Sequence, residues 1–558
     1  MRPVLSRAIL VAACAAALTL AGCGTRPPAN APIAWAPADT PWLVAKIEAT
    51  PADVAEAWTN GALITARIRQ LGSYARLIGA GSPALAKVLD AVEGELADVH
   101  SLKALTQATG LSESAPFAFY GIGDAPVIRY QLESPDAFRA FWKRVENRAG
   151  TAAPTATLDG QSYWVIGGAD ARVHILVAIE GNQVVATVAP AAASADLLKP
   201  LLGLAKPARS ATDRLGRIDS RHDYLESSAS GYIDVPRLFA NLADDKDAVT
   251  QAFAKALGVP TADPTCAGEL QSLARQVPLA TGGMHTYTTK QASGSLDVEL
   301  SPELRGALDA LKQPVPGMAE TGDHSILDVV LAAPVQKWHA FIKGRAEAAA
   351  SHTYQCPALK SLNAFAKTAA NPPVQMPPEA ASLLGFRVVL DTWTDGGQIA
   401  GRGLVASSDP AALARQIQQT LPQFALKTIP TDGKAVSFDL PPRLAAMLGG
   451  SAQGWVAANS HALAVGVGTG EGAKIPATLT AEAGNGDRLL RVHLDGRVYA
   501  LLGDWLGRLA GGVPGTSPAQ IQQQAAALSE TGKLVASGDM DVKLDDAGLH
   551  FEASVKHR

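Results

Sequence analysis

Short stretches in which hydrophobic and polar residues alternate recur along this chain, and runs with a helical period follow them. The segment 39–46 alternates like a strand, and 51–64 then has an amphipathic helical pattern. Residues 117–132 are typical of two strands around a Gly-Asp turn, and a helix is expected from Ser134 onwards. Because strands come in hairpins with helices between them, the pattern predicts an α+β fold with antiparallel sheets and helices packed on one face.

This succession occurs twice. Six pairs of segments match in the same order, at offsets from 256 to 284 residues: 39–46 with 323–330, 117–132 with 386–405, 159–165 with 432–438, 175–188 with 455–467, 232–234 with 492–495, and 278–284 with 534–540. An alternative is that α+β proteins reuse the strand–turn–strand–helix unit. We favour an internal duplication into two related lobes, 37–312 and 320–558, with a Pro-rich linker at 313–319.

The N-terminus has the pattern of a bacterial lipoprotein signal. Arg2 and Arg7 precede an apolar run that ends at Leu20-Ala21-Gly22-Cys23. We therefore expect residues 1–22 to be a signal peptide, Cys23 to carry lipid, and 23–36 to be a linker. Gly24 rather than Asp follows the cysteine, which resembles the sorting signal for the outer membrane, facing the periplasm. The alternative is an ordinary cleavage site at which Cys23 is incidental.

Two cysteines remain after the signal, because Cys14 lies within it and Cys23 is assigned to lipid. Cys266 and Cys356 are expected to form a disulfide in the oxidising periplasm, and such a bridge would tie the two lobes together. The alternative is two separate buried thiols.

The composition, with 47% hydrophobic and 18% charged residues, is that of a globular protein. The formal net charge of −4 becomes −6 without Arg2 and Arg7. A mildly acidic body argues against a nucleic-acid partner and against a broad basic face for membrane binding.

Catalytic and cofactor motifs are absent from the sequence. There is no Gly-x-Ser-x-Gly or His-Glu-x-x-His, and the glycine-rich segment 466–472 lacks the Lys of a phosphate-binding loop. We expect no cofactor and no metal. Arg129 and Arg402, at equivalent places in the two halves, could bind an anionic group, although an exposed strand arginine is the simpler interpretation. Trp58 and Trp338 are expected in the core, since each lies in an amphipathic run.

The Asp-Thr-Pro opening, the Phe-x-x-Tyr-Gly-x-Gly…Pro-Val-x-Arg strand pair and Cys266-x-x-Glu269 together resemble a family of uncharacterised proteobacterial envelope lipoproteins. The resemblance implies an envelope location and a duplicated α+β body, but no activity. The sequence thus favours a non-enzymatic binding or scaffold protein with a membrane anchor and an envelope protein partner. The alternatives are an envelope hydrolase with its site at the lobe junction and a carrier of hydrophobic cargo.

Overall fold

The structure is a computed structural model that describes residues 30–558 apart from 60, 62–63, 66–67, 69–82, 169, 244–246, 259–263, 323–324, 358, 372–375, 394–397, 421–428, 449–452 and 510–517. The predicted signal peptide 1–22 and Cys23 lie outside the described residues. Within those residues, no helix combines the length and apolar character needed to cross a membrane.

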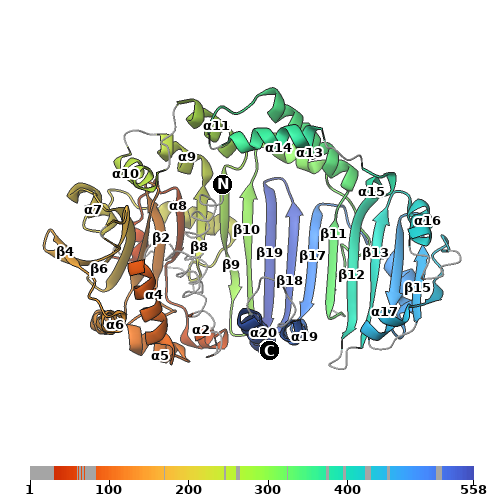
Figure 1. The fold of residues 1–558 in the computed structure, drawn as a ribbon, viewed down its shortest axis with the longest axis horizontal. Coiled ribbons are helices and arrows are strands. Elements are labelled where there is room, and N and C mark those ends of the chain that lie inside the picture. Colours follow the sequence, from red (N-terminus) through yellow and green to blue (C-terminus); the bar gives the residue numbers. More distant parts are fainter. Residues whose placement is uncertain are drawn as a thin grey trace. The chain divides into compact units, whose positions relative to one another are not determined.

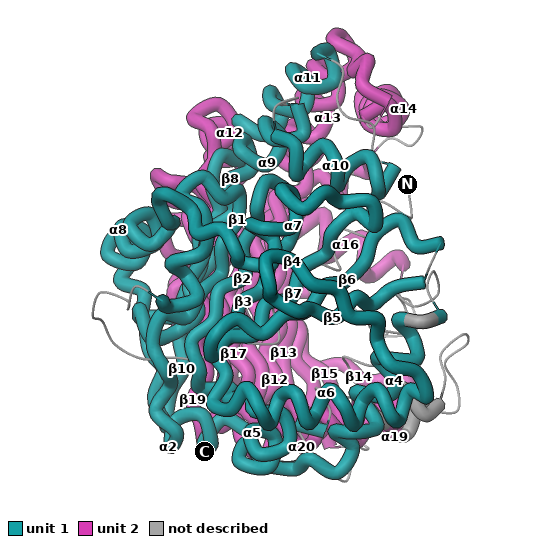
Figure 2. Tube along the Cα trace, turned by 90° about the vertical axis from the view of Figure 1, so that its left-hand side faces the viewer, with its two compact units in different colours: residues 1–296 teal, residues 297–558 magenta. Residues whose placement is uncertain are grey.

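The chain folds into two compact units, Met1–Leu296 and Asp297–Arg558 (Figure 2). The division precedes the predicted linker 313–319. Helices and antiparallel strands occur in both units, so the expectation of a mixed α+β fold with antiparallel sheets is confirmed.

Hairpins make up most of the first unit. Its strands pair in the order β4-β5-β6-β7-β3-β2-β1-β8-β9, with every pair antiparallel. The predicted helix after 134 is present, because the Ser134 side chain accepts a hydrogen bond from the Ala137 amide and Gly150 ends the helix in a left-handed conformation. The elements are η1 (Pro32–Trp35), β1 (Trp42–Lys46), α2 (Ala52–Ala57), α4 (Pro83–Leu96), α5 (Leu102–Thr109), β2 (Phe117–Ile122), β3 (Ala125–Gln131), α6 (Pro135–Ala149), β4 (Thr155–Leu158), β5 (Gln161–Ile166), β6 (Val173–Glu180), β7 (Gln183–Pro190), α7 (Ala195–Leu201), α8 (Thr212–His222), β8 (Ser230–Asp234), α9 (Val235–Ala243), α10 (Ala248–Leu257), α11 (Pro264–Ala274) and β9 (Leu279–Tyr287), and β10 (Gln291–Glu299) spans the boundary.

In the second unit the strands pair in the order β14-β15-β16-β13-β12-β11-β17-β18-β19, again antiparallel throughout (Figure 1). The elements are α12 (Pro302–Asp309), β11 (Leu327–Ala332), α13 (Val335–Ser351), α14 (Lys360–Ala370), α15 (Pro378–Ala381), β12 (Leu383–Trp393), β13 (Ile399–Ser407), α16 (Pro410–Thr420), β14 (Val436–Asp439), α17 (Pro442–Met447), β15 (Gln453–Ala458), β16 (Ala462–Val467), α18 (Glu471–Leu479), β17 (Arg488–Asp495), α19 (Arg497–Leu509), α20 (Pro518–Leu534), β18 (Val535–Leu544) and β19 (Gly548–His557).

The two strand orders correspond position by position once β4 is set aside. The order β5-β6-β7-β3-β2-β1-β8-β9 of the first unit has the same connectivity as β14-β15-β16-β13-β12-β11-β17-β18 of the second. The six sequence pairs fall on corresponding strands of these two orders.

Helices pack on both sheet faces, and not on one face as expected. In the first unit Leu201 and Leu215, from α7 and α8, pack in one core cluster, whereas Phe138 and Trp142 of α6 pack in another, with Phe117 and Tyr130. In the second unit α18 and α16 contribute to two separate clusters. The reason is that strands such as β2 carry bulky apolar side chains on both faces, and each face must be covered.

Two segments predicted as linkers are built into the cores instead. Ile33, within the predicted linker 23–36, is 1% exposed and belongs to the first core cluster. Val315 and Met318, within 313–319, are fully buried against β11 and β13. The prolines around these residues suggested linkers. The apolar side chains between the prolines are nevertheless large enough for their burial to stabilise the segments on the cores.

Candidate functional site

The central strands of the second unit carry a continuous apolar face. Because side chains alternate across a sheet, residues of one parity on neighbouring strands form rows on the same face. Three neighbouring rows cross seven strands, from β16 through β13, β12, β11, β17 and β18 to β19 (Figure 1). They are Leu463-Val405-Phe386-Leu331-Leu490-Val542-Phe551, Val465-Gly403-Val388-Val329-Val492-Met540-Ala553 and Val467-Gly401-Leu390-Leu327-Leu494-Gly538-Val555. None of these positions holds a polar or charged side chain. We call this surface the apolar face.

Much of the apolar face is open to solvent. Val388 is 50% exposed, and Leu331, Val465 and Met540 are 39–40% exposed, although α16 packs over Leu463 at one end. Strands about 4.8 Å apart and a rise of about 3.3 Å per residue give the three rows a footprint of about 700 Å². The exposed part of this footprint is smaller, because Leu463, Gly401 and Gly538 are buried and most of the other positions are partly buried.

The corresponding strands of the first unit are covered by helices of their own chain. There Phe117 and Phe119 of β2 are 1% and 8% exposed. Phe117 packs with Phe138 and Trp142 of α6 and with Leu85 of α4. In the second unit the helices between β11 and β12, α13 and α14, form a cluster with each other. The apolar face is therefore left open, because α13 and α14 pack on each other through this cluster and do not cover it as α4 and α6 cover the first unit.

The opposite face of the same strands holds a buried ionic cluster. Asp328 of β11, 1% exposed, accepts hydrogen bonds from Arg387 (3.1 and 2.8 Å) and from Arg491 (2.7 Å). Arg387 also pairs with Glu320 at 2.6 Å. Burial opposes the charge of Arg387, but the hydrogen bonds and charge of Asp328, together with Glu320, raise its pKa above the ordinary value.

The loop before β11 lies directly on this cluster. Gly317 and Gly322 both have positive φ angles, 88° and 77°. A Cβ atom at Gly317 would lie 2.1 Å from Nη1 of Arg387, and one at Gly322 would lie 2.5 Å from Nη1 of Arg491. Glycine has no Cβ atom and adopts positive φ angles without strain, so the loop can lie directly on the two guanidinium groups. The loop thus covers the charged face, whereas the apolar face stays open.

Arg402, one of the two predicted anion-binding residues, is engaged by the protein's own carboxylates. It forms ion pairs with Asp391 and with Glu471, which is fully buried, and Lys474 joins both carboxylates. The charges of this cluster are balanced, so an external anion would have to compete with Asp391 and Glu471. Anion binding by Arg402 stays a prediction without support from its surroundings.

Arg129 occupies the corresponding strand, β3, and is 1% exposed. Its guanidinium lies 3.9 Å from the ring centre of Trp35, and Gly203 leaves room for it. Burial lowers the pKa of its guanidinium, and the interactions with Tyr120 and Glu180 oppose that shift. Nothing in this packing leads to a site that solvent anions reach, so this prediction too stays unsupported.

The His493 side chain is 6% exposed and lies beside Asp539, with Nδ1 2.7 Å from the carboxylate. Trp58 is half-buried and its indole donates to the Thr288 carbonyl. The expectation for Trp338 was wrong, because its side chain is 36% exposed on α13, which packs by alanines and not by its aromatic residues.

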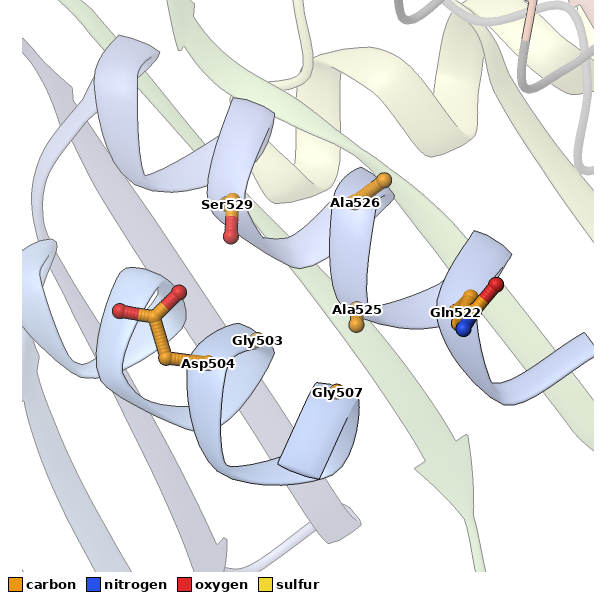
Figure 3. A pocket seen from close by; sticks show the side chains of 7 residues that line it. All are labelled: Gly503, Asp504, Gly507, Gln522, Ala525, Ala526 and Ser529. Carbon is orange, nitrogen blue, oxygen red and sulfur yellow. The ribbon is translucent and has the colours of Figure 1, made fainter. Parts of the chain in front are cut away.

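A shallow groove of about 560 Å³ lies between α19 and α20 (Figure 3). Gly503 and Gly507 of α19 face Ala525 and Ser529 of α20 across it. A Cβ atom at Gly503 would come within 2.5 Å of the Ser529 hydroxyl. Among the described residues that line the groove, Asp504 is the ionisable one.

Cys266 of α11 and Cys356, which follows α13, are disulfide-bonded, so the predicted bridge is confirmed. In the part of the chain that the structure describes, no group of three or more His, Cys, Asp or Glu side chains could hold a metal ion.

No family model matches the chain, and no curated protein or solved structure is significantly similar to it. The apolar face is thus the feature of the described residues that most needs a functional explanation. The sequence patterns missed it because strands 488–495 and 535–544 mix charged and apolar residues. The apolar rows emerge only when the register between strands is known.

Proposed function

We propose that this chain is a lipid-anchored periplasmic protein of the bacterial outer membrane that binds a protein partner through the apolar face of its second unit. The observation that carries the proposal is the set of three uncharged rows, whose central residue Val388 is half exposed. Full burial of an exposed Val or Leu contributes about 1.5–3 kcal/mol, so a half-exposed side chain such as Val388 forgoes about half of that.

The dimensions favour a protein over a small ligand. A small-molecule site is usually a concave pocket that encloses most of its ligand. Here the side chains stand on an open sheet face with a footprint of about 700 Å², close to the roughly 800 Å² that each partner contributes to a standard protein interface. The equal strand orders of the two units support an origin by duplication, and the units differ in the helical cover of this face.

Photo-crosslinking in the cell tests the binding proposal. A photoreactive amino acid replaces Val388 in the full-length chain, and a matched variant carries it at Lys434, whose side chain is 84% exposed outside the apolar face. We expect one dominant protein adduct from position 388 and not from 434. A Leu331→Asp change in the same chain should abolish that adduct.

Three outcomes would count against the proposal: no adduct at 388, equal adducts at both positions, or an adduct that persists with Leu331→Asp. Recovery of lipid without protein would favour the carrier of hydrophobic cargo, because the same rows could cover acyl chains. An adduct with a second copy of this chain would identify the partner as itself.

Lipid anchoring is tested separately. Metabolic labelling with a fatty acid should mark the wild-type chain and not Cys23→Ser, and membrane fractionation should find the label in the outer membrane. An unlabelled wild-type chain would refute the anchor.

A further inference from the structure

The two helices that leave the apolar face uncovered have an exposed surface of their own. In Figure 1, α13 and α14 lie side by side. They pack through small residues, Ala346 of α13 against Ala366 and Ala370 of α14. We call this pair, residues 335–370, the α13–α14 hairpin.

Large apolar side chains of the hairpin point away from its alanine seam. Phe365 is 65% exposed, Ile342 42%, Leu362 38% and Trp338 36%. Each residue turns the helix by about 100°. Trp338 and Ile342, eight and four residues before Ala346, are therefore rotated about the axis of α13 by roughly −80° and −40° relative to Ala346.

On α14, Leu362 and Phe365 are rotated by roughly −40° and −100° relative to Ala366. When two antiparallel helices face each other, residues that are rotated in the same direction from the contact lie on the same side of the helix pair. The four residues therefore form one apolar surface, which Phe341 extends through an edge contact with Trp338, ring centres 5.9 Å apart.

The hairpin is also basic. Between 335 and 370 it carries five cationic side chains (Lys337, Lys343, Arg345, Lys360 and Lys367) against one acidic side chain, Glu347, so its formal charge is 5 − 1 = +4 in a chain whose total is −4. Lys343 and Lys367 lie on the rotational side opposite the aromatic residues, about 60° and 100° from the alanine seam.

We propose that the α13–α14 hairpin binds the surface of an anionic phospholipid bilayer, with its Trp and Phe side chains inserted at the level of the headgroups. An apolar face with Trp, Phe and Leu beside a Lys-rich polar face is the composition of helices that lie in a membrane interface. The positive charge decides between a lipid surface and an apolar protein groove, because anionic headgroups attract Lys and Arg near the surface.

This surface is distinct from the apolar face and independent of Cys23. A chain anchored at its N-terminus alone could rotate freely about the tether. A second contact at the hairpin would hold the second unit in one orientation on the membrane.

Vesicle flotation tests the proposal with the mature chain carrying Cys23→Ser, which removes the lipid. The probes are vesicles of phosphatidylcholine alone and vesicles that also contain phosphatidylglycerol. We expect binding to the second kind, weakened by salt. Phe365→Asp should abolish it, and since Phe365 is largely exposed the fold should tolerate the change. Lys343→Gln with Lys360→Gln and Lys367→Gln should lower the partition coefficient roughly a hundredfold, at about fivefold for each Lys.

Val388→Asp is the matched control, because it places the same new charge at an exposed apolar residue outside the hairpin. It should leave vesicle binding unchanged. Failure of the Cys23→Ser chain without further substitutions to float with anionic vesicles would overturn the proposal. So would equal binding by Phe365→Asp, or loss with Val388→Asp alone, which would move the membrane contact to the apolar face. Circular dichroism of each variant excludes misfolding as the cause.

Discussion

Replacing Asp328 by Ala should lower the stability of the second unit more than a substitution of an exposed residue does. Its carboxylate is the shared partner of Arg387 and Arg491, which are 5% and 4% exposed. Asp328→Ala leaves two guanidinium groups in the interior, with Glu320 as an acidic partner of Arg387. Removing one member of a buried ion pair typically costs about 3–5 kcal/mol, because the remaining charge stays desolvated.

That cost is a large part of the roughly 5–15 kcal/mol by which a native protein is stable. For a unit of this size it corresponds to a fall in the melting temperature of about 6–20 °C, at roughly 2–4 °C per kcal/mol. Hydrogen exchange read by mass spectrometry separates the units. Peptides from β11, β12 and β17 should lose protection, and peptides from β1–β3 should not.

The control is Asp432→Ala, which removes an ion pair whose side chains are more than half exposed, and it should have no measurable effect. If Asp328→Ala is as stable as this control, then the cluster does not hold the central strands and our account of the charged face is wrong.

Three further predictions concern stability elsewhere. Burial raises the pKa of Asp219 to about 7, so its stabilising contribution is present below the unfolded pKa near 4 and is lost as the pH rises towards 7. In urea unfolding, the free energy of unfolding of Asp219→Asn minus that of wild type should therefore increase by up to about 4 kcal/mol from about pH 4 to pH 8. The same difference at both pH values would contradict this. Replacing Cys266 and Cys356 by Ala should cost about 4–5 kcal/mol, since the bridge closes a loop of about 90 residues, and an unchanged melting curve would count against it. Gly503→Ala should cost about 1–3 kcal/mol by overpacking α19 on α20. In contrast, Gly507→Ala, whose Cβ would meet its nearest atom at 3.9 Å, should be tolerated; equal effects of the two would refute the packing argument.

Local chemistry in the sequence was enough for the strand and hairpin content. Alternating residues such as those of 39–46 form β1, and the Ser134 cap with Gly150 bounds α6, because these signals act through neighbouring residues and backbone geometry. The cysteine count predicted the disulfide, since Cys266 and Cys356 remain once Cys14 is assigned to the predicted signal peptide and Cys23 to the predicted lipid. The matching order of the six segment pairs in the two halves could likewise be read from the sequence, because it does not depend on contacts between distant residues.

The open face and the hairpin were decided by tertiary structure. Val388 and Met540 become neighbours of one surface only through the register that pairs β12, β11, β17 and β18. The prolines of 313–319 indicated a linker, yet Val315 and Met318 are core residues because the chain turns back onto β11. Trp338 was assigned to a core from its helical period, but the period shows which residues share a face and not what that face packs against. Whether a face is covered depends on where other segments of the chain fold, and that contact is long-range.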